Sequence, residues 1–145
     1  MPGDQPHPEI YEPLSHTGDL GILVYGSDLP ALFAHAAWAM FDVISDVTTI
    51  RPLHTTTVDV EAIDLEDLLV RWLSELLYLY DTQRFLSCGA TFTVLEPTHL
   101  TATVRGEPFD PTHHPIDTEL KAVTYHQIAV EQVEGRWQAR VIFDL

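Results

Sequence analysis

Residues 64–82 have the sequence DLEDLLVRWLSELLYLYDT, which carries the clearest structural signal in the chain. Its apolar residues recur at spacings of three and four, the pattern of an amphipathic helix with one wide apolar stripe. The stripe consists of Leu65, Leu68, Leu69, Trp72, Leu73, Leu76, Leu77 and Tyr80. Asp64 stands at the expected N-cap, and Glu66 and Asp67 occupy the first turn, where the helix dipole favours negative charge.

The same spacing predicts a second helix nearer the N-terminus. Asp28 can cap this helix, its first turn accommodates Pro30, and it extends to about Ser45. Its apolar positions are Leu29, Leu32, Phe33, Ala36, Ala37, Met40, Phe41 and Ile44. Both helices need another layer of structure against which to bury these residues.

The rest of the chain alternates or is rich in β-branched residues, which predicts strands. They are expected at residues 21–25, 55–61, 84–95, 100–105, 122–133 and 137–143, with the last two forming a hairpin at Glu134-Gly135. Two helices segregated against a mostly antiparallel sheet make an α+β domain. Residues 1–12 contain three prolines and are expected to be a flexible tail, and residues 13–145 a single domain.

Composition limits the possible partners. The 145 residues include 22 acidic and 7 basic side chains, a formal net charge of −15, yet 46% are hydrophobic, enough for a folded core. This balance argues against direct binding to nucleic acid or to anionic membranes, which needs clustered Lys and Arg. Part of the acidity can also reflect a high-salt habitat. Lys121 is the only lysine.

Several functional classes lack their sequence signals. Cys88 is the only cysteine, so neither an intramolecular disulfide nor a CxxC zinc site is expected. No apolar run approaches the ~20 residues of a membrane helix, and the N-terminus does not resemble a signal peptide, so we expect a cytoplasmic protein. The chain contains no GxSxG, P-loop, HExxH or glycine-rich dinucleotide motif, and the residues alone make no case for an enzyme.

Two polar segments could bind metal. Residues 15–19, SHTGD, offer oxygen ligands for a hard divalent cation, although the same residues also suit a simple turn. The loop at residues 106–119 carries His113 and His114 beside Asp110 and Asp117. These groups could bind a transition metal. Since adjacent side chains diverge, hydrogen-bonded histidines in a surface loop are the alternative interpretation.

Two further segments could contribute charged groups to a site. Lys121 opens a predicted strand, on one face with Val123 and Tyr125, where it could form an ion pair or meet a phosphate or a partner's carboxylate. The final predicted strand leads to Asp144 and Leu145. If these lie near Asp19, the crowded negative charges need a cation. Sequence spacing alone does not show that they meet.

Five stretches, in order, resemble the archease family: residues 15–26, 29–46, 64–82, 105–127 and 137–145. The long motifs LLVRWLSELLYLYDT, GEPFDPTHHPI and ELKAVTYH carry most of this resemblance. It implies a strand-helix-strand-strand, SHS2-like fold, in agreement with the α+β prediction. Gly18 departs from the alanine common before the family's aspartate, and the N-terminal tail lies outside the resemblance.

The resemblance implies an accessory protein and not an enzyme. Archeases promote guanylylation and multiple turnover of the RtcB-type RNA ligase in tRNA splicing and RNA repair, and they widen its choice of nucleotide cofactor. The implied metal ligands are Asp19, Asp144 and Leu145, with calcium as the usual ion, and Lys121 is implicated in ligase activation together with the two aspartates. The acidic surface is then expected to dock on a basic region of the ligase, so that nucleic acid is met only through that partner.

Two alternatives stay open from the sequence. One is a divalent-metal-dependent hydrolase that uses His16, Asp19, His114 and Asp144, although no pairing of base and nucleophile is visible. The other is a general chaperone or modulator of nucleic-acid enzymes, which has been suggested for some archeases.

Overall fold

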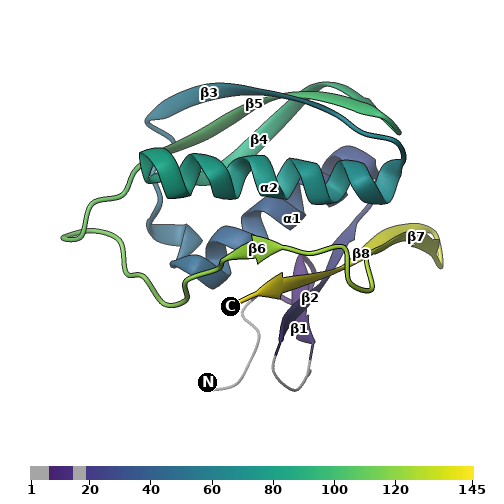
Figure 1. Ribbon diagram of the computed structural model, residues 1–145, viewed down its shortest axis with the longest axis horizontal. Helices are drawn as coiled ribbons and strands as arrows, with labels where there is room; N and C mark the ends of the chain where they lie inside the picture. Colours follow the sequence, from purple (N-terminus) through teal and green to yellow (C-terminus); the bar gives the residue numbers. More distant parts are fainter. Residues whose placement is uncertain (1–6, 15–18) are drawn as a thin grey trace.

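The structure is a computed structural model that describes residues 7–14 and 19–145. Its elements are β1 (Tyr11–Leu14), β2 (Leu20–Gly26), α1 (Leu29–Ile44), the 3-10 turn η1 (Val47–Thr49), β3 (His54–Glu61), α2 (Leu65–Gln83), β4 (Phe85–Glu96), β5 (His99–Pro108), β6 (Ala122–Val123), β7 (Ala129–Val133) and β8 (Arg136–Asp144). Figure 1 shows both helices between two groups of strands.

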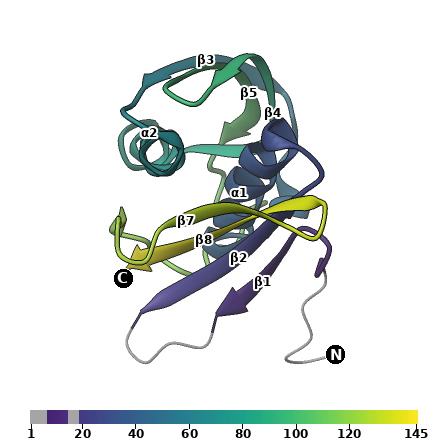
Figure 2. The same ribbon diagram turned by 90° about the vertical axis from the view of Figure 1, so that its right-hand side faces the viewer.

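The strands form two antiparallel sheets, where the sequence suggested one. The larger sheet has the order β1-β2-β8-β6, with β7 also paired to β8, and the smaller sheet has the order β3-β5-β4. Figure 2 shows the helices in the layer between the two sheets. The predicted α+β class and the β7–β8 hairpin are confirmed.

Helix α1 is the centre of the core. It packs against β2 of the larger sheet and β4 of the smaller one, so it is covered from two sides. For that reason, no residue of Leu29–Ile44 other than Pro30 is exposed. The end of β2 approaches α1 closely, since a Cβ at Gly26 would lie 2.4 Å from the Leu32 nitrogen. A side chain at position 26 would push the strand away from the helix.

Helix α2 buries the predicted stripe and is joined to α1 by a hydrogen bond. The Trp72 Nε1–H donates to the Phe33 carbonyl at 2.9 Å inside the core. Both predicted caps are confirmed: Asp28 accepts from the Ala31 amide and Asp64 from the Asp67 amide, each at 2.8 Å. In the described part of the chain, neither helix is long and apolar enough to cross a membrane.

The prediction of one strand over residues 122–133 was wrong. The chain forms β6, leaves the sheet in a turn, and returns as β7. Gln127 in this turn adopts a positive φ of 53°, which a continuous strand does not allow. Tyr125 therefore does not share a strand face with Lys121 and Val123, and its hydroxyl donates to Asp67 Oδ1 of α2 at 2.6 Å.

The predicted boundary between tail and domain also needs correction. β1 begins at Tyr11 and pairs with β2 along its whole length, so residues 11 and 12 belong to the sheet. Tyr11 is buried, and its hydroxyl donates to Asp42 Oδ2 of α1 at 2.7 Å. Few apolar residues mark this segment, and its order depends on contacts with distant residues, which periodicity does not report.

Candidate functional site

One end of the larger sheet holds the residues that the sequence singled out. Leu20 pairs with Phe143, which places Asp19 immediately before the first residue pair of β2 and β8. On the other side of β8, Asp144 pairs with Ala122, and the Lys121 amide donates to the Asp144 carbonyl at 2.8 Å. Three neighbouring strand ends thus place Asp19, Lys121 and Asp144 at the same end of the larger sheet, where Leu145 follows Asp144.

This sheet end offers charged groups to solvent. Asp19, Lys121, Asp144 and Leu145 are all exposed. The possible ligands of a cation here are carboxylate and main-chain oxygens, the donor type that calcium prefers. The donor set therefore fits the calcium ion that the family resemblance implies. His16, the other candidate in this region, lies outside the described residues.

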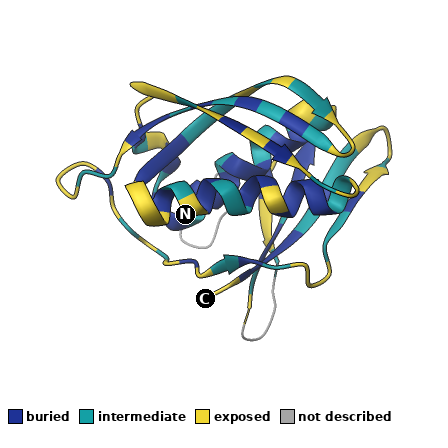
Figure 3. Cartoon of the chain, turned by 45° about the horizontal axis from the view of Figure 1, so that its top comes forward, coloured by how far each residue is buried: buried dark blue, intermediate teal, exposed yellow. Residues whose placement is uncertain are grey.

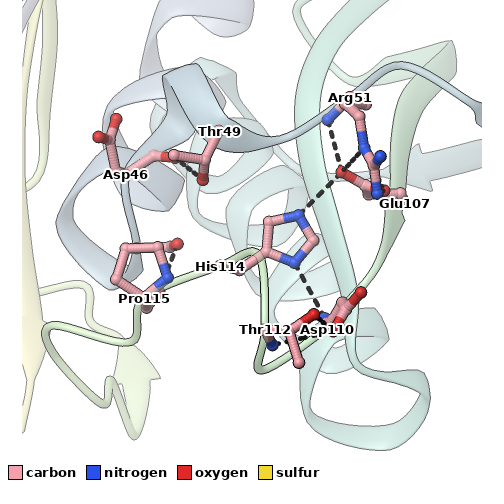
Figure 4. Close-up of polar contacts among 9 residues, drawn as sticks. Asp46, Thr49, Arg51, Glu107, Asp110, Thr112, His114 and Pro115 are labelled. Carbon is pink, nitrogen blue, oxygen red and sulfur yellow. Dashed lines mark hydrogen bonds and ion pairs between the residues drawn. The ribbon is translucent and has the colours of Figure 1, made fainter.

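His114 belongs to a different place, a buried network beneath the loop that follows β5 (Figure 4). Its Nδ1 accepts a hydrogen bond from the Asp110 amide at 2.9 Å, and its Nε2 lies 2.8 Å from Glu107 Oε2. Because Nδ1 is an acceptor, the ring proton sits on Nε2 and is donated to Glu107. The imidazole is thus a neutral bridge between the loop and β5.

The same network explains the charge of Glu107. Its carboxylate accepts from the Arg51 amide at 2.7 Å and from the Arg51 guanidinium at 2.9 Å. Burial alone would raise the pKa of Glu107, but the hydrogen bonds from Arg51 and His114 outweigh it and lower the pKa to about 2. Glu107 is therefore a buried, fully paired anion.

The hydrogen bonds of His114 and Glu107 compete with metal binding by the loop. Glu107, His113 and His114 offer ligand atoms within 4.8 Å of one another. However, both nitrogens of His114 are engaged, and Arg51 occupies both oxygens of Glu107. A metal would have to displace these bonds, so the arrangement matches hydrogen-bonded histidines, with His113 exposed at the surface.

The network also fixes the path of the loop towards Lys121. The amide of Asp117 donates to the Ile44 carbonyl at 2.8 Å, and Ser45 Oγ donates to the Pro115 carbonyl. Together with His114, these bonds tie the loop to the end of α1 and to β5. The chain then enters β6 at the sheet end described above, with Lys121 just before the strand.

Comparison with known proteins identifies the family. The sequence model of the Archease protein family matches residues 11–145. The chain belongs to the archease family. This archease is 38% identical to Protein archease of Methanosarcina mazei over 139 residues, which span 93% of this chain and 95% of that protein. It is 37% identical to Protein archease of Pyrococcus furiosus, over 93% of this chain and 98% of that protein.

Solved structures agree with the fold of this archease. The solution structure of protein 1598 of Methanobacterium thermoautotrophicum matches with a TM-score of 0.78 and 34% identity, over 94% of this chain and 99% of that chain. The crystal structure of a Thermotoga maritima archease, described as a possible chaperone, matches with a TM-score of 0.64 over 92% of this chain and 96% of that one. At 18% identity, this second likeness shows the fold alone.

Sequence reasoning about this archease missed the partners of His114. Arg51 follows η1 and Glu107 lies in β5, so nothing local connects them. The position of Glu107 inside the GEPFDPTHHPI motif was the available signal, but it did not separate this carboxylate from the other acidic residues.

Proposed function

We propose that this archease is a non-catalytic accessory protein that activates an RtcB-type RNA ligase in tRNA splicing and RNA repair. It promotes guanylylation of the ligase, so that the ligase turns over repeatedly. The observation that carries the proposal is that three neighbouring strand ends place Asp19, Lys121 and Asp144 together at one exposed end of the larger sheet. Membership of the archease family supports an accessory role.

A divalent cation, calcium by the chemistry of the donors, would be held by Asp19, Asp144 and the main-chain oxygens of Leu145. Asp19 and Asp144 would offset the charge of the cation, and the cation would supply open coordination positions for an oxygen ligand of the partner. Calorimetric titration of calcium into the protein tests this site directly. Asp144→Asn should abolish the heat of binding, whereas Glu131→Gln, on β7 at the other end of β8, should leave it unchanged.

Lys121 supplies a positive side chain at this end of the sheet. Its ammonium is a compact, flexible charge that can meet a nucleotide phosphate or a carboxylate of the ligase. Because the backbone amide of Lys121 donates to the Asp144 carbonyl, the main chain of Lys121 lies beside the proposed cation site. The ligase would thus meet the Lys121 ammonium and the cation site in one contact.

The net charge of −15 suits a basic partner. Charge complementarity speeds the encounter of two proteins and orients them, and screening at cellular salt keeps the complex weak enough to release. Release is required for an activator that serves many ligase molecules. Nucleic acid would be contacted only through the ligase.

The test mixes this archease with an RtcB-type ligase from the same source, GTP and a divalent ion, and follows covalent guanylate on the ligase over many turnovers. Stimulation at substoichiometric archease is expected. Absence of stimulation at every ratio would show the proposal to be wrong. Hydrolysis of RNA or nucleotide by archease alone, lost in Asp19→Ala, would instead favour a metal-dependent hydrolase.

Single variants test the assignment of residues. Asp19→Ala, Asp144→Ala and Lys121→Ala should each lower stimulation about tenfold or more, because each removes a charged group from the contact. Glu131→Ala is the matched control, since it removes an exposed carboxylate of the same sheet that does not lie at this sheet end. Wild-type stimulation by all three site variants would contradict the assignment.

A further inference from the structure

The outward side of α2 lies between two open strand edges. Figure 1 shows α2 with β3 on one side and β6 on the other. In the part of the chain that the structure describes, β3 is an edge strand of the smaller sheet and β6 an edge strand of the larger one. Figure 3 shows exposed positions recurring along α2, between buried ones.

Tyr78 is the exposed aromatic residue on this side of α2. It lies outside the apolar stripe of α2, and 59% of the residue is exposed. The other aromatic residues of the helix, Trp72 and Tyr80, are fully buried. An exposed tyrosine among polar neighbours adds nothing to the core, but its ring can be buried against a partner.

Two hollows flank the Tyr78 ring. One, of about 440 Å³, lies between α2 and β3 and is lined by Asp59, Glu61, Glu75 and Tyr78 among others. The second, of about 180 Å³, lies between α2 and β6 and is lined by Tyr78, Asp81 and Lys121 among others. Tyr78 therefore separates two depressions into which side chains of a partner can fit.

The charges around the ring are mostly negative. Asp59, Glu61, Glu75 and Asp81 contribute carboxylates. Hydrogen bonds from Thr101 and His99 lower the pKa of Asp59, so this residue stays ionised. The positive charge of Arg71 is already paired with Asp67, at 2.9 Å. Among the described residues that line the two hollows, Lys121 is the cation outside any ion pair, at the border towards the sheet end.

We propose that this α2 face, defined by Asp59, Glu61, Glu75, Tyr78, Asp81 and Lys121, is the surface on which a basic region of the RNA ligase docks. The inference rests on the proposed function and extends its contact from Lys121 across the helix. Tyr78 is the anchor that becomes buried, and the carboxylates around it meet Lys and Arg side chains of the ligase.

The role of Tyr78 as an anchor is tested by measuring the binding of this archease to its ligase by calorimetry, separately from guanylylation. Tyr78→Ala should raise the dissociation constant about tenfold or more, and Tyr78→Phe should change it by less than about threefold, because the ring is kept. Leu53→Ala, which truncates another exposed apolar side chain outside the face, should leave it unchanged. Thermal unfolding of Tyr78→Ala should match that of the wild type, since an exposed side chain is removed.

Charge-reversed variants test the partner's chemistry. Glu75→Lys and Asp81→Lys should each weaken binding and make it less sensitive to salt, because each removes an attraction to the basic region. Glu131→Lys makes the same change in net charge on β7 and should have little effect. Equal effects at all three positions would mean that net charge, and not this face, determines binding, and would overturn the inference.

Two failures are distinguishable. If wild-type archease neither binds nor stimulates the ligase, the proposed function is wrong, and the docking surface with it. If the wild type stimulates the ligase and Tyr78→Ala binds with the same dissociation constant, the docking surface is wrong and the proposed function stands.

Discussion

Glu107 shows how one buried charge is accommodated in this protein. Its side chain is 4% exposed and that of His114 is fully buried. An unpaired carboxylate in such a place is strongly destabilising, but hydrogen bonds from Arg51 and His114 satisfy both oxygens. Arg51 follows η1, His114 lies in the loop and Glu107 itself belongs to β5, so the anion joins three segments. It thereby positions the chain that leads to Lys121.

His114→Ala should lower the free energy of unfolding by about 3 kcal/mol, because it leaves a cavity and removes two hydrogen bonds. Urea denaturation measures the change. The matched control is His113→Ala, which removes the exposed neighbour and should cost less than about 0.5 kcal/mol. Equal costs at the two positions would contradict the buried-bridge role of His114.

Glu107 should also shape the acid stability of the fold. Its pKa falls from 4.5 to about 2 in the folded protein, so the folded state takes up this proton later than the unfolded chain as pH falls. The stabilisation is complete above the unfolded pKa and disappears as pH falls through the window from 4.5 to about 2.

The measurement compares wild type with Glu107→Gln in urea at about pH 6 and about pH 3. The wild type should lose more unfolding free energy than the variant between these conditions, because the variant has no carboxylate to protonate. A constant difference between the two proteins would show that Glu107 does not titrate in this window.

Among the secondary-structure elements, the two helices are the parts with strong local signals. Asp28 begins α1 and Asp64 begins α2, each through a hydrogen bond to the amide three residues later. At the other end of α2, Arg84 takes the left-handed conformation with φ of 56°. The helices therefore start where a side chain can satisfy the free amides of the first turn.

Asp28→Ala and Asp64→Ala should each lower the free energy of unfolding by about 1 kcal/mol. Asn at either position can still accept the capping hydrogen bond and should therefore keep most of this stabilisation. Asp81→Ala, in the last turn of α2, is the control, because it removes the same single negative charge as the two cap variants. It should be neutral or slightly stabilising, because a carboxylate at a helix C-terminus opposes the dipole. A loss at position 81 equal to that at the caps would assign the effect to charge and not to capping.

How far the sequence predicts these elements depends on whether their causes are local. Caps and apolar spacing lie within a few residues, so both helices and most strands were predictable. The break between β6 and β7 was not, because it depends on Tyr125 reaching Asp67 in α2. The ion pair of Arg51 and Glu107 was hidden for the same reason. Asp19 and Asp144 come to the same end of the sheet because of the register between β2 and β8, and the spacing of residues in the sequence does not reveal that register.

For the whole molecule, two sheets with helices between them give the acidic chain its core. The described elements share one apolar core around α1 and α2, and of the described acidic residues only Asp67 and Glu107 are buried. With only 7 basic residues, many of these carboxylates have no cation nearby to offset them. Their mutual repulsion is relieved when the chain unfolds and expands.

Salt should therefore stabilise this protein. The free energy of unfolding should rise by about 1 kcal/mol or more between low salt and about 0.5 M KCl, because the screening length becomes shorter than the spacing of surface charges. The double variant Glu96→Gln and Glu131→Gln, which removes two exposed charges, should show a smaller rise. An identical rise in wild type and variant would assign the effect to general salt exclusion.

The central place of β8 in the larger sheet has a consequence for synthesis on the ribosome. β2, β6 and β7 all pair with β8, yet β8 emerges after all the other described strands. Until then, β2 has β1 as its partner, and its other edge stays open. The end of the sheet that carries Asp19, Lys121 and Asp144 therefore forms only when β8 joins. A chain that lacks β8 cannot form this end of the sheet, so any partner that recognises it would distinguish chains with β8 in place from chains without it.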